Sequence, residues 1–475
     1  MTQLSHIELL RSISEATGKE RAERLKELSE LTQRLIDSTG RGLSLSEADL
    51  SNLRLDEVDL RRATLNRAVL HGTQLQRATL DEITMVCPGM ERTNLSGASL
   101  RSAYVHALAA QTCNFDGADL SELRDATGTL FHGCSMRGVH LDGSHLAGSS
   151  FYQCDLSDAS LSQANLQGSL INECLLDDAE LLGCCCDQLT VTKTSLRGTS
   201  FQRASGRGLV LQRLTASDAL NLTDAGLPEL RLSDISGRDW RAAGLKAPHA
   251  DLTDVTAPGA DLTGAELSGA RLLRCSLPDA ALTGALLNNG KIVGGDLRRA
   301  DLRGAHGENL SIVEADLTEA NLTSFTGRCL TVRDGNLARV VLRFANLYRA
   351  MITGDPPRGM SLRGAVLEGA TLVQAYLAAD LRDADLSGAN CAYSRFSQSD
   401  LSGARLDGTN MYQSTWVKVT LHGARVKGVR APVFADRCPG LRSALSQAEG
   451  PDAAEFRTFL DSFDAALAAG RKGST

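Results

Sequence analysis

The sequence predicts a mainly β repeat protein whose chain turns a corner every five residues. Large apolar side chains recur at a spacing of five from Leu50 to Leu80, and small residues such as Ala63 and Ala68 stand two positions earlier in their repeats. A helix needs apolar spacings of three and four, and a flat strand needs alternation, so a period of five fits neither. Aromatic residues are only 4% of the 475 residues, so leucine and small side chains must supply the core.

The period of five continues along the chain with changes of phase. The large positions run from Leu50 to Leu120, from Met136 to Phe201, from Leu252 to Leu377 and from Leu381 to Val426. Segments such as 260–274 (ADLTGAELSGARLLR) and 383–390 (DADLSGAN) repeat the pattern A-(D/N)-L-x-x. In this pattern the chain resembles the pentapeptide-repeat proteins. The resemblance implies a right-handed quadrilateral β-helix, in which four repeats form one square coil.

The phase changes divide the expected β-helix into parts. We expect a first repeat part at 43–203, irregular coils or a loop at 204–249, and a second repeat part at 250–430, with a smaller excursion at 354–358. The irregular segment is rich in Gly and Pro, and Trp240 stands in it where a leucine is expected. Loops on a regular scaffold often carry function, but a tolerated insertion explains both segments equally well.

Short helical caps are expected at both ends, because an open β-helix end exposes a sheet edge. In residues 1–42, Ser5 and Glu8 have the spacing of a capping box, and a second helix is expected from about Thr17 to Gly40. These helices either cover the first coil or bind a partner.

The C-terminal segment 431–475 carries an amphipathic helical pattern. Phe456, Phe459 and Phe463 lie on one face of it. They either pack on the last coil or form a homodimer contact, since some pentapeptide-repeat proteins dimerise through C-terminal elements.

The cysteines test the coil length. Cys134, Cys154 and Cys174 follow one another at intervals of four repeats, and Cys113 precedes Cys134 by four repeats and one inserted residue. We expect an inward column in which a small apolar thiol replaces alanine, with no metal or disulfide chemistry. In the run 184–186, the outer two thiols should point inward, and Cys185 is the candidate reactive thiol.

Charge and motifs exclude several functions. The chain has 50 basic and 57 acidic residues, a net charge of −7, so direct nucleic-acid binding is not expected. No apolar run long enough to span a bilayer and no secretory signal is visible, which favours a cytoplasmic protein with no membrane partner. No phosphate-binding loop, nucleophile elbow or zinc-protease motif occurs, so we expect no enzyme activity, cofactor or metal.

The strongest charge asymmetry lies at residues 114–187. This segment holds twelve acidic residues against two arginines, a net charge of −10, and it could attract a basic partner. The candidate contact residues are Asp155, Asp158, Asp177 and Asp178, and a solvated face without a partner is the competing interpretation.

The sequence therefore favours a non-catalytic protein-binding scaffold. Some pentapeptide-repeat proteins imitate duplex DNA and bind type II topoisomerases, so a DNA-mimic modulator or protector of DNA gyrase is the first alternative. Such repeats also occur in bacterial secretion systems, which makes an accessory or effector protein of such a system the second.

Overall fold

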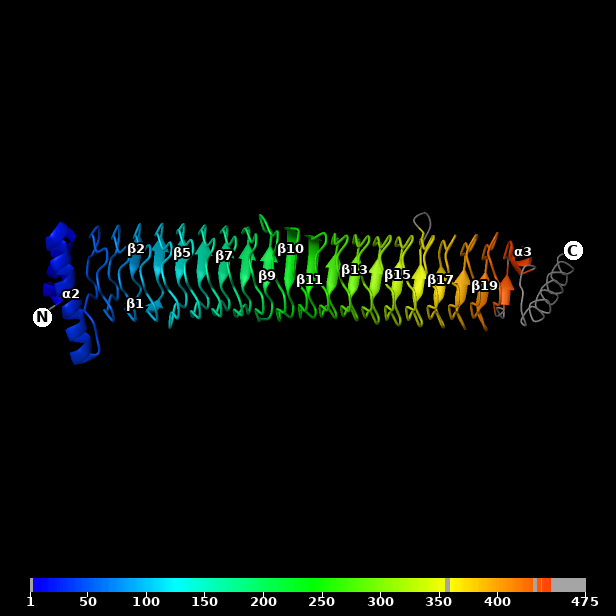
Figure 1. Cartoon of the computed structure of the whole chain (residues 1–475), viewed down its shortest axis with the longest axis horizontal. Coiled ribbons are helices and arrows are strands. Elements are labelled where there is room, and N and C mark those ends of the chain that lie inside the picture. The colour runs from blue at the N-terminus through cyan, green and yellow to red at the C-terminus, as the bar shows by residue number, and fades with distance from the viewer. Residues whose placement is uncertain (1–2, 355–358, 430–433, 437, 446–475) are drawn as a thin grey trace. The chain divides into compact units, whose positions relative to one another are not determined.

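The computed structural model describes residues 3–354, 359–429, 434–436 and 438–445. The chain forms two compact units, Met1–Arg241 and Ala242–Thr475. In each unit the backbone winds into coils that stack one on the next (Figure 1).

A tight turn closes most repeats; on the strand side it is replaced, as at Cys154, whose N donates to Cys174 Sγ in the next coil. The N–H of the small residue donates to the carbonyl oxygen of the large residue three positions earlier, as from Ala48 to Leu45 at 3.2 Å. The residue two after the large position has a positive φ, 60° for both Glu47 and Asn52. This combination is the geometry of a type II turn. The turn bends the chain every five residues, which explains the period in the sequence.

Parallel hydrogen-bond ladders join successive coils. Leu50 N donates to Val69 O at 2.9 Å, and Val69 N donates to Ala48 O at 3.0 Å. Bridges such as Asp49↔Val69 and Asp59↔Thr79 join equivalent positions four repeats apart, so four repeats make one coil. The predicted quadrilateral β-helix is confirmed.

Short strands mark one side of the coils. In unit 1, β2, β4–β9 and β10 pair in this order along that side, and β1 pairs with β3 on another. Their bounds are β1 Thr84–Val86, β2 Gly89–Glu91, β3 Tyr104–His106, β4 Ala109–Gln111, β5 Leu130–His132, β6 Ser150–Tyr152, β7 Leu170–Asn172, β8 Thr190–Thr192, β9 Val210–Gln212 and β10 Arg231–Ser236.

Unit 2 repeats this arrangement. Its strands β11 to β20 pair in sequence order, each parallel to the next, and the short helix α3 (Leu441–Leu445) follows them. The bounds are β11 Asp251–Thr256, β12 Arg271–Leu273, β13 Lys291–Val293, β14 Ser311–Val313, β15 Thr331–Arg333, β16 Met351–Thr353, β17 Tyr376–Ala378, β18 Arg395–Ser397, β19 Thr415–Val417 and β20 Phe434–Asp436.

The interior of each unit is a set of side-chain columns. The large positions stack on themselves, and in unit 1 the rings of Phe131 and Phe151 lie parallel with their centroids 5.0 Å apart. In unit 2, Leu267 is 1% exposed and Leu386 is fully buried. Burying one such side chain contributes about 2 kcal/mol.

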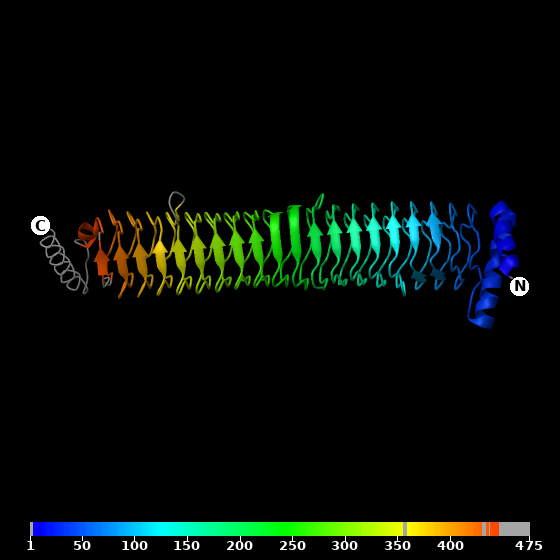
Figure 2. The ribbon, with the colours of Figure 1, turned by 180° about the vertical axis from the view of Figure 1, so that it is seen from behind.

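Two helices cover the first coil of unit 1. They are α1 (Gln3–Glu15) and α2 (Gly18–Thr39), seen from both sides in Figures 1 and 2. Their side chains bond to backbone groups of the first coil that have no earlier coil to pair with. Ser14 Oγ accepts from Arg54 N (2.8 Å), and Arg21 donates to Arg54 O (3.1 Å) and Asp56 O (3.0 Å). Thr32 Oγ1 donates to Asp59 O (3.0 Å), and Gln3 Nε2 donates to Ser46 O. The helices thus satisfy the polar edge of the sheet.

The sequence predicted the end of α2 correctly and the start of α1 incorrectly. Helix α2 ends at Gly40, which has a φ of 72°, as the sequence indicates. The capping box is wrong, because α1 begins at Gln3 and Ser5 lies inside its first turn. Gln3 is held by the first coil, so the tertiary contact extends the helix beyond the local capping signal.

Of the two expected alternatives for 204–249, coils or a loop, the structure has coils. The irregularity of this segment is one inserted residue, since Ser195 pairs with Ala216 at a spacing of 21. The pattern fades because Ser217 and Gly237 occupy large positions. Trp240 fills the space they leave, is 6% exposed, and donates from Nε1 to Ser217 O at 2.6 Å. A Cβ on residue 237 would overlap this ring.

Two other predicted features lie at or beyond the limits of the described chain. The excursion at 354–358 falls largely outside it, although Gly354 lies so close to Met360 N that a Cβ would overlap it. The bridges that cross this excursion join residues 25 positions apart, as in Asn336↔Ser361, whereas bridges between regular coils such as Asp59↔Thr79 join residues 20 positions apart. Phe456, Phe459 and Phe463, with their predicted helix, lie outside the described residues.

Replacing Leu267 or Leu386 by Asp should destabilise the protein by about 4 kcal/mol or more, because each change buries an unpaired charge. Replacing Ser268, an outward neighbour of Leu267, by Asp should change stability by less than about 0.5 kcal/mol. Chemical unfolding followed by the β-dominated circular dichroism signal measures both. Equal losses in the inward and outward variants would contradict the assignment of the columns.

The cap of unit 1 should loosen in acid. His6 in α1 is 5% exposed, and burial lowers its pKa below the ordinary 6.5. Since the unfolded chain then binds more protons, the stability that neutral His6 contributes is present above pH 6.5 and is lost as pH falls below it. Hydrogen exchange of α1 amides should quicken between pH 7.5 and 5.5, after correction for the intrinsic rate. The variant His6→Leu should lack this effect, and an unchanged pH dependence in the variant would assign it to other groups.

Candidate partner-binding surface

The four predicted contact residues share one side of two successive coils in unit 1. Asp155 and Asp158 flank the inward Leu156, and Asp177 and Asp178 follow the inward Leu176 one coil later. Asp158 N donates to Asp177 O at 2.9 Å, so the two pairs lie on adjacent coils. These four residues are called the acidic side below. The fold brings together residues that are up to 23 positions apart.

Two carboxylates of the acidic side hold the backbone. Asp155 Oδ1 accepts from Ser157 N at 3.0 Å and from Ser157 Oγ at 2.6 Å. Asp177 Oδ1 accepts from Arg197 N at 3.1 Å and from Ser195 Oγ in the next coil. Both side chains are half-buried. Their first role is therefore structural, and replacing them would disturb the coil.

The other two carboxylates point to solvent at coil corners. Asp158 and Asp178 are exposed and have φ values of 60° and 58°. Aspartate tolerates this left-handed region better than most residues do. Asp178 Oδ1 lies over Gly198, where a Cβ would overlap it. Within the described chain neither carboxylate has an ion pair, so both charges are available to a partner.

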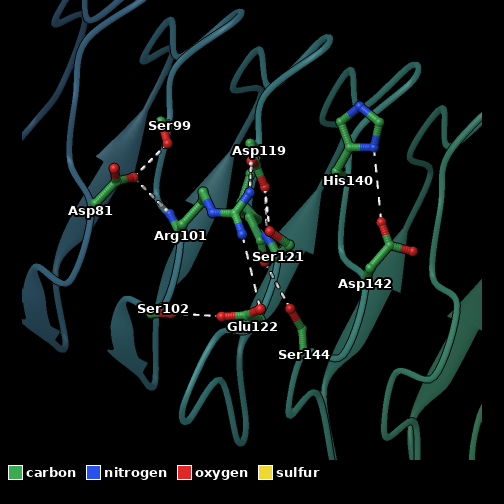
Figure 3. A network of polar contacts seen from close by, with 11 residues as sticks. Asp81, Ser99, Arg101, Ser102, Asp119, Ser121, Glu122, His140, Asp142 and Ser144 are labelled. Atoms are coloured by element: carbon green, nitrogen blue, oxygen red, sulfur yellow. Dashed lines mark hydrogen bonds and ion pairs between the residues drawn. The ribbon is translucent and has the colours of Figure 1, made fainter.

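The neighbouring side of unit 1 also carries acids, but these are paired. Figure 3 shows Arg101 between Asp119 and Glu122, with distances of 3.3 Å from Nη1 to Asp119 Oδ2 and 3.9 Å from Nη2 to Glu122 Oε1. Burial alone would raise the pKa of Asp119, but hydrogen bonds from Ser121 and the charge of Arg101 lower it. One guanidinium thus faces two carboxylates and offsets part of the negative charge on this side.

The predicted thiol column lies inside unit 1. Cys113, Cys134, Cys154 and Cys174 are each 2% exposed. The Cys154 thiol donates to Phe131 O at 3.4 Å, as the Thr73 hydroxyl donates to Leu50 O at 2.9 Å in an earlier coil. Although the Cys113 thiol favours the thiolate of Cys134, the hydrogen bond of Cys154 and burial together raise the pKa of Cys134 to about 12. The column fills the small inward position, where its sulfurs are shielded from solvent.

Other thiols are more accessible than the predicted one. Cys184 and Cys186 point inward with their sulfurs 3.0 Å apart, while Cys185 is half-buried with its sulfur 3.7 Å from Asp187 Oδ2. Cys87 and Cys329 are exposed, which the sequence analysis missed. Both stand two residues after a large position, at corners with φ of 50° and 56°. That position was the signal that could have identified them.

Comparison with known families agrees with this geometry. Eight copies of the pentapeptide-repeat model match residues 44–81, 127–163, 159–198, 250–289, 293–323 and 379–415. The chain belongs to the pentapeptide-repeat family. A search of functionally characterised proteins found no match.

Solved structures of other pentapeptide-repeat proteins are similar to parts of this chain. HetL, involved in heterocyst differentiation regulation in the cyanobacterium Nostoc sp. strain PCC 7120, is 22% identical over 62% of this chain and 94% of its own, with a TM-score of 0.17. QnrB1, a plasmid-mediated fluoroquinolone resistance protein, is 15% identical over 51% of this chain and 96% of its own, with a TM-score of 0.23. Rfr23 from the cyanobacterium Cyanothece 51142 is 16% identical over 36% and 97%, with a TM-score of 0.10.

Among the described helices, none has the length and apolar character needed to cross a membrane. In the same part of the chain, no group of three or more His, Cys, Asp or Glu residues is placed to hold a metal ion.

A mild thiol reagent should separate the cysteines by exposure. Cys87 and Cys329 should react first, Cys185 more slowly, and Cys134, Cys154 and Cys174 only on unfolding, because the reagent must reach the sulfur. Mass spectrometry of labelled peptides over time measures the order. Labelling of Cys154 at the rate of Cys87 in the folded protein would show that the column is not closed.

Proposed function

We propose that this pentapeptide-repeat protein is a non-catalytic scaffold that binds a basic segment of another protein through the acidic side of unit 1. The observation that supports it best is the pair Asp158 and Asp178, two exposed carboxylates at corners of successive coils. Their backbone is held by coil-to-coil hydrogen bonds, so little conformational freedom is lost on binding.

The geometry suggests the chemistry of the partner. Successive coils lie about 4.8 Å apart, so a partner would present two cations at about that spacing. An extended segment with lysine or arginine at alternate positions, which lie about 6.6 Å apart along a strand, could reach both corners with its flexible side chains. Asp155 and Asp177 add negative potential behind them while they hold the coil.

A DNA-mimic modulator of a type II topoisomerase is the second candidate. Carboxylates on successive coils of one side favour it. Two features weigh against it: Arg137 Nε lies 3.8 Å from Asp155 Oδ2, and the exposed Arg197 follows Asp178 one coil later. Positive charges thus flank the acidic side at both ends, where a mimic of the DNA backbone would carry further negative charges.

Replacing Asp158 and Asp178 together by Lys should weaken the basic partner at least about tenfold, because two attractions become repulsions of about 1 kcal/mol or more each. Lys193 and Lys418 occupy the same position of their own repeats, on the strand side, with φ of 52° and 55°, so lysine is accepted at a left-handed corner of this protein. Affinity capture with the full chain from the native cell extract, quantified by mass spectrometry at about 50 mM and 300 mM salt, measures the change. Wild-type capture should fall as screening increases.

The matched control is Asp224→Lys with Asp239→Lys. Both residues are exposed corners of unit 1, with φ of 56° and 57°, outside the acidic side. A partner retained by the control and lost by the Asp158/Asp178 variant supports the proposal. A partner retained equally by both would show that the acidic side is only solvated. Inhibition of DNA gyrase supercoiling that disappears in the Asp158/Asp178 variant would favour the DNA mimic.

A further inference from the structure

A second surface, on unit 2, has the opposite charge. It lies at the corner beside strands β17 and β18 (Figure 1), where the chain passes from the side of Leu347 and Leu372 to the strand side. Its outward residues are Tyr348, Arg349, Tyr376, Tyr393, Arg395 and Tyr412, called the Arg–Tyr corner below. Tyr376 pairs in register with Arg395, and Tyr393 N donates to Tyr412 O at 2.9 Å, so these residues occupy successive coils.

The composition of this corner is unusual for the chain. It holds four of the six tyrosines in the sequence. Tyr393 and Tyr412 are 52% and 46% exposed, and the adjacent Met351 is 46% exposed. Tyrosine, arginine and methionine are enriched in the centres of protein interfaces, because they bring contact area together with polar groups.

The arginines of this corner differ from other corner arginines of unit 2. Elsewhere a corner guanidinium reaches the carboxylate one coil earlier, as in Arg299–Asp279 at 2.7 Å and Arg339–Glu319 at 2.7 Å. The position one coil before Arg349 is Cys329, and the guanidinium of Arg349 lies 5.4 Å from the centre of the Tyr348 ring. Its Nε also donates to Gln374 Oε1 at 2.9 Å.

Arg395 repeats this arrangement. Its guanidinium lies 5.7 Å from the centre of the Tyr376 ring. Among the described residues, neither Arg349 nor Arg395 has a carboxylate within ion-pair distance. Tyrosine rings therefore hold two exposed cations in place without neutralising them.

We propose that the Arg–Tyr corner is a docking surface for an acidic segment of a partner protein. Two carboxylates of the segment would pair with Arg349 and Arg395, and the rings of Tyr393 and Tyr412 would cover its apolar side chains. Held guanidiniums favour such pairing because little side-chain freedom remains to be lost. This surface lies on unit 2 and does not depend on the function proposed for the acidic side.

The geometry favours a protein over a single-stranded nucleic acid. Arg349 and Arg395 are separated by two coil steps, about 9.6 Å, and no continuous basic track joins them. Tyr393 and Tyr412 meet edge to face at 89°, with centroids 5.7 Å apart, and so do not form parallel platforms for successive bases. Tyr348 already lies between two guanidiniums, since Arg328 is 5.6 Å from its centre.

The test uses the full chain as bait for a phage-displayed library of random dodecapeptides. Enriched peptides should carry an excess of Asp and Glu, and fluorescence anisotropy should show at least tenfold weaker binding to the variant Arg349→Glu with Arg395→Glu. The variant Tyr393→Ala with Tyr412→Ala should also weaken binding, although it changes no charge. Its melting temperature, compared with that of the wild type, separates lost contact from lost fold.

The matched control is Arg203→Glu with Arg231→Glu. Arg203 is an exposed corner residue with a φ of 55°, and Arg231 is exposed at the start of its strand, as Arg395 is. The control should bind the peptides like the wild type, as should the Asp158/Asp178 variant. If the acidic side binds no basic partner, the binding of acidic peptides to the Arg–Tyr corner is still expected, so each proposal can be contradicted without the other.

Three results would overturn the proposal. The first is enriched peptides without an acidic excess, or with equal affinity for the charge-reversed Arg349/Arg395 variant. The second is a poly(dT) strand that binds more tightly than the peptides and is lost in that variant. The third is a homodimer in sedimentation velocity that disappears in both the Arg349/Arg395 and the Asp158/Asp178 variants, which would assign the corner to a second copy of this chain.

Discussion

The type II turn that closes most repeats is the constraint on which the rest of the structure depends. Its hydrogen bond, from Ala48 N to Leu45 O in the first coil, fixes two inward positions, and its left-handed residue, Glu47, must point outward. The remaining N–H and C=O groups then face along the stack and can pair only with another coil. A coil is therefore stable only between neighbours, which is why the exposed edge of the first coil needs the polar side chains of α1 and α2.

The same constraint separates the interior from the surface. Inward positions accept only what fits the column, and the thiol of Cys154 bonds as the hydroxyl of Thr73 does in an earlier coil of the same column. Outward positions contact other outward residues of the same or adjacent coils, so those that hold no backbone group can vary with little effect on the fold. A column may carry compensating pairs, as in Arg299–Asp279, or leave like charges unpaired, as in Asp158 and Asp178. The charge that this scaffold presents to a partner thus depends on which outward columns contain ion pairs and which contain unpaired like charges.

The period of five predicted the corners and the inward columns, because both are local consequences of each repeat, and the resemblance to the pentapeptide-repeat proteins then implied the β-helix. The period was least informative where an unusual residue completes a column: Ser217 and Gly237 look irregular in sequence, but Trp240 of the next repeat fills the space they leave. The predicted capping box at Ser5 was wrong, since the first coil decides where α1 begins. The four aspartates were placed together correctly, yet the sequence could not separate their roles. That separation depends on donors such as Arg197 N and Ser195 Oγ, which are supplied by the next coil.

Rigid columns also determine what kind of binding this protein can perform. A side chain at a left-handed corner has its backbone held by the ladder on both sides, so its remaining freedom is that of its own rotamers. At Asp178 and Arg349 even this freedom is reduced, by the close approach of the carboxylate to Gly198 and by the ring of Tyr348. A partner that matches such a surface loses mainly its own freedom on binding, and affinity then depends on the match of charges along the stack. Selectivity on such a scaffold follows from the spacing of its coils and the order of residues in a column, without any moving part.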